Sequence, residues 1–331
     1  MSNPTVLVTG GAGYVGSHCA MALAEAGFTP VVYDNLSNGH AGFARFGPFE
    51  QGDIRDRARL DAVFARWRPV GVLHFAALIE VGVSVRDPGP FWDVNVHGLL
   101  RVLDVMRAHA VRPIVFSSTC ATYGAPQFLP LTEAHPQLPL SPYGWTKLAA
   151  ERAILDQSDA YGVRATLLRY FNAAGAAPEH GLGERHEPET HALPLALYTL
   201  LGKRPHFSLF GDDYDTRDGS CVRDYVHVLD LAAAHVAALR RALAGGETRA
   251  YNLGVGDGVS VLELLAAIAR VTGREVPLQR APRRPGDSPA LVADSRRAAK
   301  ELGWTPTRGL DEIVASAWRW HAESETTAPT G

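Results

Sequence analysis

The fold is indicated by residues 5–16, which read TVLVTGGAGYVG. Thr5–Thr9 is a β-branched run typical of a buried strand, and glycines follow it at 10, 13 and 16. Residues 14–26 then carry apolar side chains at helical spacing and stop at Gly27. Glycine tolerates the positive φ of a tight turn and lets backbone N–H groups approach a phosphate, and a helix N-terminus favours negative charge. This strand–turn–helix order predicts a dinucleotide-binding site.

Strand and helix patterns alternate through the first half of the chain. After a strand at residues 29–33, helical patterns near 57–67, 89–110 and 142–160 separate further strands at 70–75, 111–118 and 163–171. These strands are continuous apolar runs, as expected where both faces of a parallel sheet are covered. The pattern predicts an α/β fold with a Rossmann-type, doubly wound parallel sheet.

The composition changes after Phe171. Residues 173–190 are rich in Gly, Ala, Pro and Glu without a period, and residues 277–289 crowd proline, glycine and arginine, so we expect binding loops there. Helical patterns return at 192–202 and 228–243. We expect a dinucleotide-binding domain over residues 1–173, with a return segment near 223–250, and a smaller mixed α/β substrate-binding domain over residues 174–331.

The overall composition argues against several partners. The chain has 331 residues and a formal charge of −3 without a long run of one sign, which argues against nucleic acid or a membrane surface as partner. Its start lacks a signal-peptide pattern, and no stretch reaches the roughly 18 apolar residues of a membrane span. Three separated cysteines fit a reducing compartment, so we expect a cytoplasmic protein.

Asp34 ends the second strand, near the spacing at which an acidic residue accepts a hydrogen bond from the adenosine ribose. A carboxylate there repels a 2′-phosphate, so the position favours NAD over NADP. The alternative, that Asp34 only caps the following turn, stays open. Asp53, in a Gly-Asp-Ile stretch, is a second candidate for contact with the adenine.

Tyr143 and Lys147 lie four residues apart, so on a helix they share one face. A free phenol titrates near pH ~10, but a nearby ammonium and a positively charged nicotinamide ring lower its pKa. Such a tyrosine can take a proton from a substrate hydroxyl while a hydride leaves to the cofactor. Thr119 ends the preceding strand, where the ligand crevice of this architecture lies. The alternative, that Thr119 bonds only the backbone of a turn, stays open.

These blocks resemble the extended short-chain dehydrogenase/reductase family and, within it, the UDP-glucose 4-epimerases. The resemblance covers nearly the whole chain and rests on the blocks VTGGAGYVGSH, YDNLSNGH, GDIRD, VLHFAAL, SPYGWTKLAAE, LLRYFNAAGA, YNLG, APRRPGDSPALVAD and, most distinctively, FGDDYDTRDGSCVRDYVHVLDLA. It implies UDP-glucose/UDP-galactose 4-epimerase activity with tightly bound NAD. In that reaction the C4 hydride leaves to NAD, a transient 4-keto sugar turns over, and the hydride returns to the opposite face.

The resemblance also implies roles for individual residues. Tyr143 is the catalytic base and acid, Lys147 holds the nicotinamide ribose, and Thr119 bridges the substrate hydroxyl and the tyrosine. The expected cofactor-binding residues, besides Tyr143 and Lys147, are Gly10, Gly13, Tyr14, Val15, Gly16, Asp34, Asn35, Leu36, Ser37, Asn38, Gly39, Asp53, Ile54, Phe75, Ala76, Ala77, Leu78, Asn95, Ser117, Tyr170 and Phe171. The expected substrate-binding residues, besides Thr119 and Tyr143, are Asn172, His191, Ala192, Ser208, Leu209, Phe210, Arg223, Arg284, Asp287 and Leu291. A homodimer through the helices near 89–110 and 142–160 is implied as well.

Some positions depart from the family pattern. Ile79 stands where a lysine is common, Val94 replaces the first of two asparagines, and His191-Ala192 replaces an Asn-Leu pair. Leu291 falls where certain members have a tyrosine that narrows the sugar pocket. A smaller side chain leaves room for an N-acetyl group, so we hypothesise activity on UDP-GlcNAc and UDP-GalNAc as well.

Other functions stay open on the sequence alone. An epimerase of UDP-pentoses or UDP-uronates would hold its nucleotide in the same way, and a non-catalytic NAD-sensing protein would keep the fold without turnover. A 4,6-dehydratase needs an additional acid and base after the Ser-Ser-Thr stretch, where this chain has Cys120-Ala121. The aspartates at 212–218 lack the glycine and terminal glutamate of a calcium loop, so we expect no metal.

Overall fold

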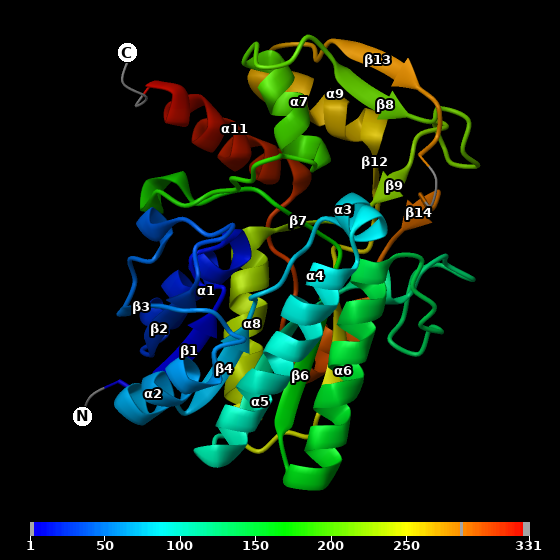
Figure 1. Ribbon diagram of the computed structural model, residues 1–331. Helices are drawn as coiled ribbons and strands as arrows, with labels where there is room; N and C mark the ends of the chain where they lie inside the picture. Colours follow the sequence, from blue (N-terminus) through cyan, green and yellow to red (C-terminus); the bar gives the residue numbers. More distant parts are fainter. Residues whose placement is uncertain (1–2, 285–286, 327–331) are drawn as a thin grey trace.

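The computed structural model describes residues 3–284 and 287–326 (Figure 1). Its centre is a seven-stranded parallel sheet in the order β11-β6-β5-β4-β1-β2-β3. The strands are β1 (Thr5–Thr9), β2 (Thr29–Asp34), β3 (Phe49–Gln51), β4 (Gly71–His74), β5 (Pro113–Thr119), β6 (Arg164–Tyr170) and β11 (Arg249–Leu253). The strand order reverses between β1 and β4, which is the switch point of a doubly wound sheet. The predicted fold class is confirmed.

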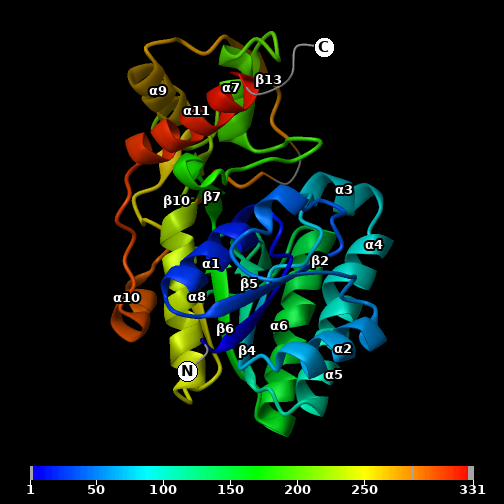
Figure 2. The ribbon, with the colours of Figure 1, turned by 90° about the vertical axis from the view of Figure 1, so that its left-hand side faces the viewer.

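Helices cover both faces of this sheet. Side chains of a strand alternate between its faces, so Leu7 packs with one set of helices and Val6 and Val8 with the other. The first set is α2 (Arg57–Trp67), α5 (Leu99–Ala108) and α6 (Pro142–Tyr161); the second is α1 (Tyr14–Glu25), α8 (Val228–Leu243) and α10 (Arg296–Leu302). Figure 2 shows α1 and α8 on one side of the sheet and α2, α5 and α6 on the other. Burial of both faces explains the continuous apolar runs of the strands.

A second group of elements lies above the large sheet in Figure 1. Three helices pack around their own apolar cluster: α7 (Ala192–Leu200), α9 (Val261–Thr272) and α11 (Leu310–Thr326). Short strand pairs and a three-stranded sheet accompany them: β7 (Asn172–Ala174) with β10 (Tyr225–His227), β8 (Phe207–Phe210) with β13 (Leu278–Ala281), and β12 (Val259–Ser260), β9 (Val222–Arg223) and β14 (Ala290–Leu291) together. The predicted return segment supplies α8, which covers the large sheet, and the beginning of β11, which extends it.

The structure refines several predicted elements. The helix expected at 89–110 consists of α4 (Gly89–Trp92), a π-helical turn at Asp93–Gly98 and α5. The preceding α3 (Val81–Arg86) and the 3₁₀ turns Ala41–Phe43, Cys120–Thr122 and Pro178–His180 were not expected. The segment 277–289, expected to be a loop, contains the strand β13. The sequence did not indicate this strand, because its mostly exposed side chains give no core pattern. Among the described residues, none of the helices has the length and apolarity to cross a membrane.

Candidate active site

The glycine loop joins the end of β1 to the start of α1 and has no side chains to fill it. Gly10 has φ +71°, and a Cβ on it would lie 2.5 Å from the backbone nitrogen of Ala76. A Cβ on Gly16 would lie 2.2 Å from the carbonyl oxygen of Gly10. A Cβ on Gly13 would approach only the Gly10 oxygen, at 3.3 Å, so this residue borders open space at the N-cap of α1. The loop is therefore a backbone cradle at a helix N-terminus, as a pyrophosphate requires.

Asp34 is buried at the end of β2 and faces this loop. Its carboxylate accepts hydrogen bonds from the backbone N–H of Ala12, at 3.0 Å, and of Leu36, at 2.8 Å. Burial raises the pKa of Asp34, and these two hydrogen bonds oppose that rise. The capping role considered for Asp34 is present in the structure. Its contact with a ribose stays a prediction, and the bond to Ala12 holds the carboxylate beside the cradle.

The residues after Asp34 form a loop tied to two neighbouring segments. Asn35 donates to the Asp53 carboxylate at 3.0 Å, and Asn38 donates to Glu80 at 3.5 Å. Arg55 also binds Asp53, and its hydrogen bonds hold the pKa of that carboxyl below its usual range. The carboxylate of Asp53 thus anchors the loop that would face an adenosine.

The stretch Phe75–Leu78 follows β4 and passes against the glycine loop, as the close approach of Ala76 to Gly10 shows. Asn95 fixes this stretch: its side chain bonds the backbone N–H and carbonyl of Leu78 at 2.8 and 3.0 Å and donates to Thr146 Oγ1 at 3.1 Å. Asn95 lies in the π-helical turn, a feature common at functional sites. It therefore connects the cradle wall to α6 through its side chain.

The three predicted catalytic residues meet at the ends of β5 and α6. The Thr119 side chain lies beside the Tyr143 phenol and lowers its pKa. Lys147 donates from Nζ to the carbonyl of Ser117 at 3.0 Å and lies 5.0 Å from the centre of the Phe116 ring. All three side chains are buried. Thr119 also accepts from the backbone N–H of Ala121, so the turn role considered for it is present beside its contact with the phenol.

This group is connected to the cradle through β4. His74, at the end of β4, bonds the Thr9 side chain at 2.8 Å, and burial together with the positive charge of Lys147 lowers the pKa of His74 to about 3. On the other side, Ser117 bonds the Tyr170 hydroxyl at 2.5 Å. The structure thus brings the ends of β1, β4, β5 and β6 together at the switch point of the sheet.

The electrostatics of the protein alone do not make the phenol acidic. Burial raises the pKa of Tyr143 well above its ordinary value, Tyr170 raises it further, and the Thr119 side chain lowers it. Burial also lowers the pKa of Lys147 to about 8, against the raising effect of Glu151. The Lys147 ammonium donates to the Ser117 carbonyl. An additional positive charge is therefore needed for the expected acidification.

Sequence reasoning missed a buried network that positions α6. Glu151, one turn after Lys147, accepts two hydrogen bonds from Arg169 of β6, at 2.9 and 2.6 Å, and one from Ser118 at 2.5 Å. Arg169 also donates to the Tyr123 hydroxyl at 3.1 Å, which donates to Asn252 at 2.6 Å. The paired charges sit inside otherwise apolar strands and helices, and the sequence period gives no sign of their partners.

Leu291 lies close to the catalytic group. It packs on a buried cluster of Tyr123, Leu131, Phe171 and Ala293, and Cys120 packs on the same cluster. Burial raises the pKa of the Cys120 thiol to about 12, so this cysteine is not a ready nucleophile. The expected role of Leu291 in limiting the sugar pocket stays a prediction.

The predicted phosphate-binding arginines come from two facing segments. Arg223 pairs with Leu291 in the β9–β14 register and donates to the carbonyls of Val222 and Ser288, both at 2.9 Å. Its guanidinium also lies 3.7 Å from Asp287, which accepts from Arg284 at 2.9 Å. Arg284 lies 4.8 Å from the centre of the Phe210 ring on β8. Residues 285–286, inside the predicted Arg284 to Asp287 stretch, lie outside the described residues. Asn172, Ser208 and Leu209 belong to β7 and β8 of the same region.

The side chains of His191 and Tyr14 lie beside a cluster of histidines and glutamates. Tyr14 donates to the carbonyl of Gly175 at 2.6 Å, and its ring meets His186 edge to face. His191 lies 2.9 Å from both Glu184 and Glu189. Burial lowers the pKa of the neighbouring His186, but the nearby carboxylates of Glu184 and Glu189, at 3.4 and 3.5 Å, raise it to about 9. Sequence reasoning did not find this His/Glu cluster.

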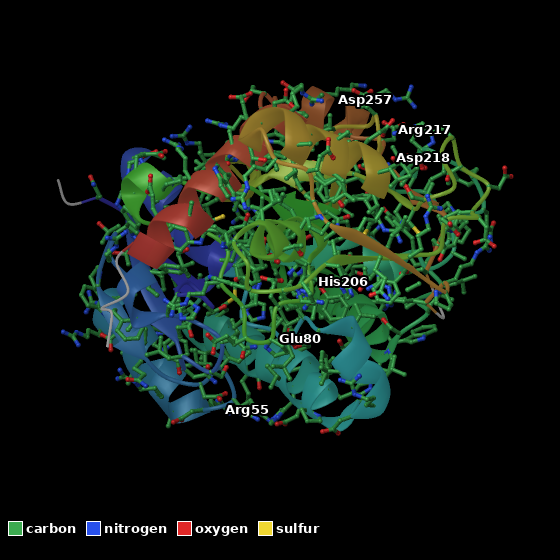
Figure 3. The ribbon with its side chains drawn as sticks, turned by 90° about the horizontal axis from the view of Figure 1, so that it is seen from above. Arg55, Glu80, His206, Arg217, Asp218 and Asp257 are labelled. Atoms are coloured by element: carbon green, nitrogen blue, oxygen red, sulfur yellow. The ribbon has the colours of Figure 1, made fainter. Side chains whose placement is uncertain are left out.

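Asp212, Asp213 and Asp218 pair with arginines or cap turns. Asp213 accepts from Arg283 at 2.7 Å, and Asp218 accepts from the backbone and side chain of Ser220. Arg217 and Asp218 lie next to each other at the α9 side of the molecule (Figure 3). Arg217 bonds Glu263, and Asp218 bonds Ser260, the N-cap residue of α9. These acidic groups therefore have protein partners.

A parallel sheet with this glycine cradle, and with Thr, Tyr and Lys side chains at its switch point, defines the class of extended short-chain dehydrogenases/reductases. Residues 7–317 match the model of the GDP-mannose 4,6 dehydratase family. The chain is 56% identical to UDP-glucose 4-epimerase of Rhizobium leguminosarum bv. trifolii, over 98% of this chain and 99% of that protein. The chain belongs to the UDP-glucose 4-epimerase family.

Solved structures agree with this assignment. UDP-glucose 4-epimerase from Brucella ovis in complex with NAD is 48% identical, with a TM-score of 0.93 over 96% of this chain and 98% of that chain. The enzyme from Bifidobacterium longum in complex with NAD⁺ and UDP is 38% identical, with a TM-score of 0.93 over 98% and 100%. The resemblance stated from the sequence blocks is thereby confirmed.

Proposed function

We propose that the chain is a UDP-glucose 4-epimerase that interconverts UDP-glucose and UDP-galactose with tightly bound NAD. The observation that carries the proposal is the meeting of Thr119, Tyr143 and Lys147 beside the glycine cradle. The two residues after Thr119 support it further, because Cys120-Ala121 offers no acid–base pair for dehydration. The relatives are named as enzymes, which argues against the NAD-sensing alternative.

The residues present fit a dinucleotide. The bare backbone of Gly10, Gly13 and Gly16 would hold the pyrophosphate, and Asp34 would bind the adenosine ribose and exclude a 2′-phosphate. Lys147 would hold the nicotinamide ribose. When bound, NAD supplies the acceptor and the donor of the hydride at C4, and its positive ring supplies the charge that the buried phenol lacks.

In the proposed reaction Tyr143 takes the proton from O4 and later returns it. Thr119, beside the phenol, would hold it toward the substrate hydroxyl. Arg223 and Arg284 hold the UDP, since guanidinium groups pair well with pyrophosphate oxygens. With UDP anchored, the 4-keto sugar turns over between the two hydride transfers. We propose that residues 1–173, with the return segment near 223–250, bind NAD, and that residues 174–331 bind the UDP-sugar.

The decisive experiment is NMR of the purified protein with UDP-glucose, after absorbance has shown whether nicotinamide is bound. UDP-galactose is the expected product. Tyr143→Phe should lower kcat by about 10²–10⁴-fold, the range of general acid–base catalysis, and should keep bound NAD. The control is Tyr161→Phe, an exposed tyrosine at the end of the same helix, which should keep the parent rate. A Tyr143→Phe variant within tenfold of the parent would contradict the proposal. UDP-pentoses and UDP-uronates are assayed in parallel to test the alternative epimerase substrates.

We also propose a homodimer. Large apolar side chains are exposed on the neighbouring helices expected to form it: Trp92 on α4, Leu100 on α5, and Trp145 and Leu155 on α6. These helices lie side by side (Figure 1). Exposed apolar groups on neighbouring helices are typical of an interaction surface. The three unpaired cysteines support a reducing, cytoplasmic location.

A further inference from the structure

A cluster of four metal-ligating side chains lies outside the proposed active site, in the segment that leads into α7. Glu184, His186, Glu189 and His191 each present one ligand atom, and these four atoms lie within 4.8 Å of one another. His191 Nδ1 is 2.9 Å from Glu184 and from Glu189, and His186 Nδ1 is 3.4 and 3.5 Å from them. Two histidines thus meet two carboxylates at one point.

Two atoms of this cluster are buried without a hydrogen-bond partner. They are His186 Nδ1 and Glu189 Oε2. The Glu189 side chain is only 4% exposed. Its other oxygen, Oε1, accepts from the backbone N–H groups of Thr190 and His191, at 2.7 and 2.8 Å, which fixes the carboxylate and turns Oε2 toward His186. Oε2 and His186 Nδ1 lie 3.5 Å apart, an ion-pair distance at which neither makes a hydrogen bond, so an ion placed between them would satisfy both atoms.

The spacing of the atoms suits a tetrahedral metal ion. Zinc bonds of about 2.0–2.2 Å to nitrogen and carboxylate oxygen put neighbouring ligands roughly 3.2–3.6 Å apart. His186 Nδ1 already has this spacing, at 3.4 Å from Glu184 Oε1 and 3.5 Å from Glu189 Oε2. His191 Nδ1 lies 2.9 Å from Glu184 Oε1 and from the other Glu189 oxygen, and the four ligand atoms spread over as much as 4.8 Å, so these groups have to shift when an ion binds. Two carboxylates and two neutral imidazoles balance the charge of one divalent cation.

We propose that Glu184, His186, Glu189 and His191 bind one Zn²⁺ ion. Mixed nitrogen and oxygen donors suit zinc among the transition metals, and four protein ligands leave no open position, so the site is structural. This proposal reverses the expectation of a metal-free protein, and it places His191 in the metal site rather than against the sugar.

The position of the cluster suggests that the ion stabilises the packing between three segments of the chain. Trp320 of α11 donates to the carbonyl of Glu184 at 3.0 Å, and His40 bonds the carbonyl of Arg185 at 3.1 Å. Tyr14, the first residue of α1, packs edge to face on His186. The zinc would fasten the segment 184–191 where it meets the cradle helix and α11. The proposal is independent of the epimerase reaction, because no ligand belongs to the catalytic group.

The test measures metal content and coordination rather than turnover. Tag-free protein is stripped with a chelator, given one equivalent of ZnCl₂, desalted and analysed by mass spectrometry. About one zinc per chain is expected in the parent and in the control His180→Gln, an exposed histidine a few residues away. His186→Gln and Glu189→Gln should each lower the retained zinc by about tenfold or more.

Absorbance spectroscopy with CoCl₂ is a second measurement. It uses the parent protein, so it does not depend on whether a variant folds. Four mixed nitrogen and oxygen ligands should give the intense visible bands of tetrahedral Co²⁺, and one equivalent of Zn²⁺ should abolish them. Zinc should also raise the melting temperature of the stripped parent but not of Glu189→Gln. A parent that neither retains zinc nor gives these bands has only a His–Glu ion-pair network there, and that result overturns the proposal. Equal zinc retention by His186→Gln and the parent overturns it as well.

Discussion

Single buried charges decide the chemistry of this site. Lys147 is enclosed between Phe116 and the Ser117 carbonyl, and burial lowers the pKa of its ammonium. The phenol of Tyr143 is buried as well, and burial alone keeps it protonated. In the proposed reaction the protein would supply the geometry of proton transfer, and the positive ring of NAD would supply the charge that favours the phenolate.

The pKa of Lys147 predicts an alkaline limit to activity. Burial lowers this pKa to about 8, so the ammonium is charged below that pH and neutral above it. We expect kcat to fall as the pH rises through about 8. Lys147→Met should lose about 10²-fold or more in kcat and should lack this alkaline step. Lys300→Met, an exposed lysine on α10, is the control and should keep the step. The pH profile of kcat measures both; persistence of the step in Lys147→Met would refute its assignment.

We expect the size of the side chain at position 291 to set the width of the sugar pocket. Leu291 packs on the cluster that contains Phe171, and Cys120, the residue after Thr119, packs on the same cluster. Leu291→Tyr should lower kcat/KM for UDP-GlcNAc at least about tenfold, because the added ring occupies the space of the N-acetyl group, and should leave UDP-glucose turnover within a few-fold. Kinetics on both sugar pairs, by the same NMR assay, measure this. Unchanged N-acetyl activity in the variant would show that Leu291 does not limit the pocket.

At the scale of elements, α6 is attached to the sheet by a buried ion pair. The Arg169 and Glu151 side chains are 6% and 2% exposed and make a two-point contact between β6 and the helix that carries Tyr143 and Lys147. Removing one partner leaves an uncompensated charge inside the protein. The contact thus sets the position of the catalytic helix.

We expect Arg169→Met to lower the free energy of unfolding by about 3–5 kcal/mol, since Glu151 then stays buried without its partner. Urea unfolding at neutral pH measures the change. The double variant Arg169→Met, Glu151→Met should recover part of the loss. Arg152→Met, on the exposed side of the same helix, should change stability by less than about 1 kcal/mol. An Arg169→Met variant as stable as the parent would rule out the anchoring role.

At the scale of the whole molecule, buried histidines make the protein sensitive to acid. Burial lowers the pKa of His74 to about 3 and that of His18, His227, His235 and His321 to about 4. In the unfolded chain these groups titrate near pH 6.5. Below that pH the unfolded state binds more protons, so stability falls as the pH drops from about 6.5 toward 4.

Each such histidine should cost roughly 2 kcal/mol of stability at pH 5, which is about 1.5 units below the unfolded pKa. His235→Leu isolates one of them, because its imidazole bonds only the Leu231 carbonyl and Nε2 has no partner. Urea unfolding at pH 7.5 and 5 should show a smaller loss in this variant than in the parent. Equal losses would mean that His235 does not contribute.

Local residue patterns were enough to predict the β1–loop–α1 unit, the strand–helix alternation and the Tyr143–Lys147 pair, because backbone geometry imposes these periods within a few residues. The partners of buried groups needed the tertiary structure: Tyr123 meets Asn252 and Trp320 meets Glu184 only because the sheet order and the packing of α11 bring distant segments together. The same holds for the His/Glu cluster. Its four residues are close in sequence, but they lie in a loop, where no helix or strand period predicts the direction of a side chain. Only the packing of this loop against α1 and α11 buries the four residues and brings their ligand atoms together.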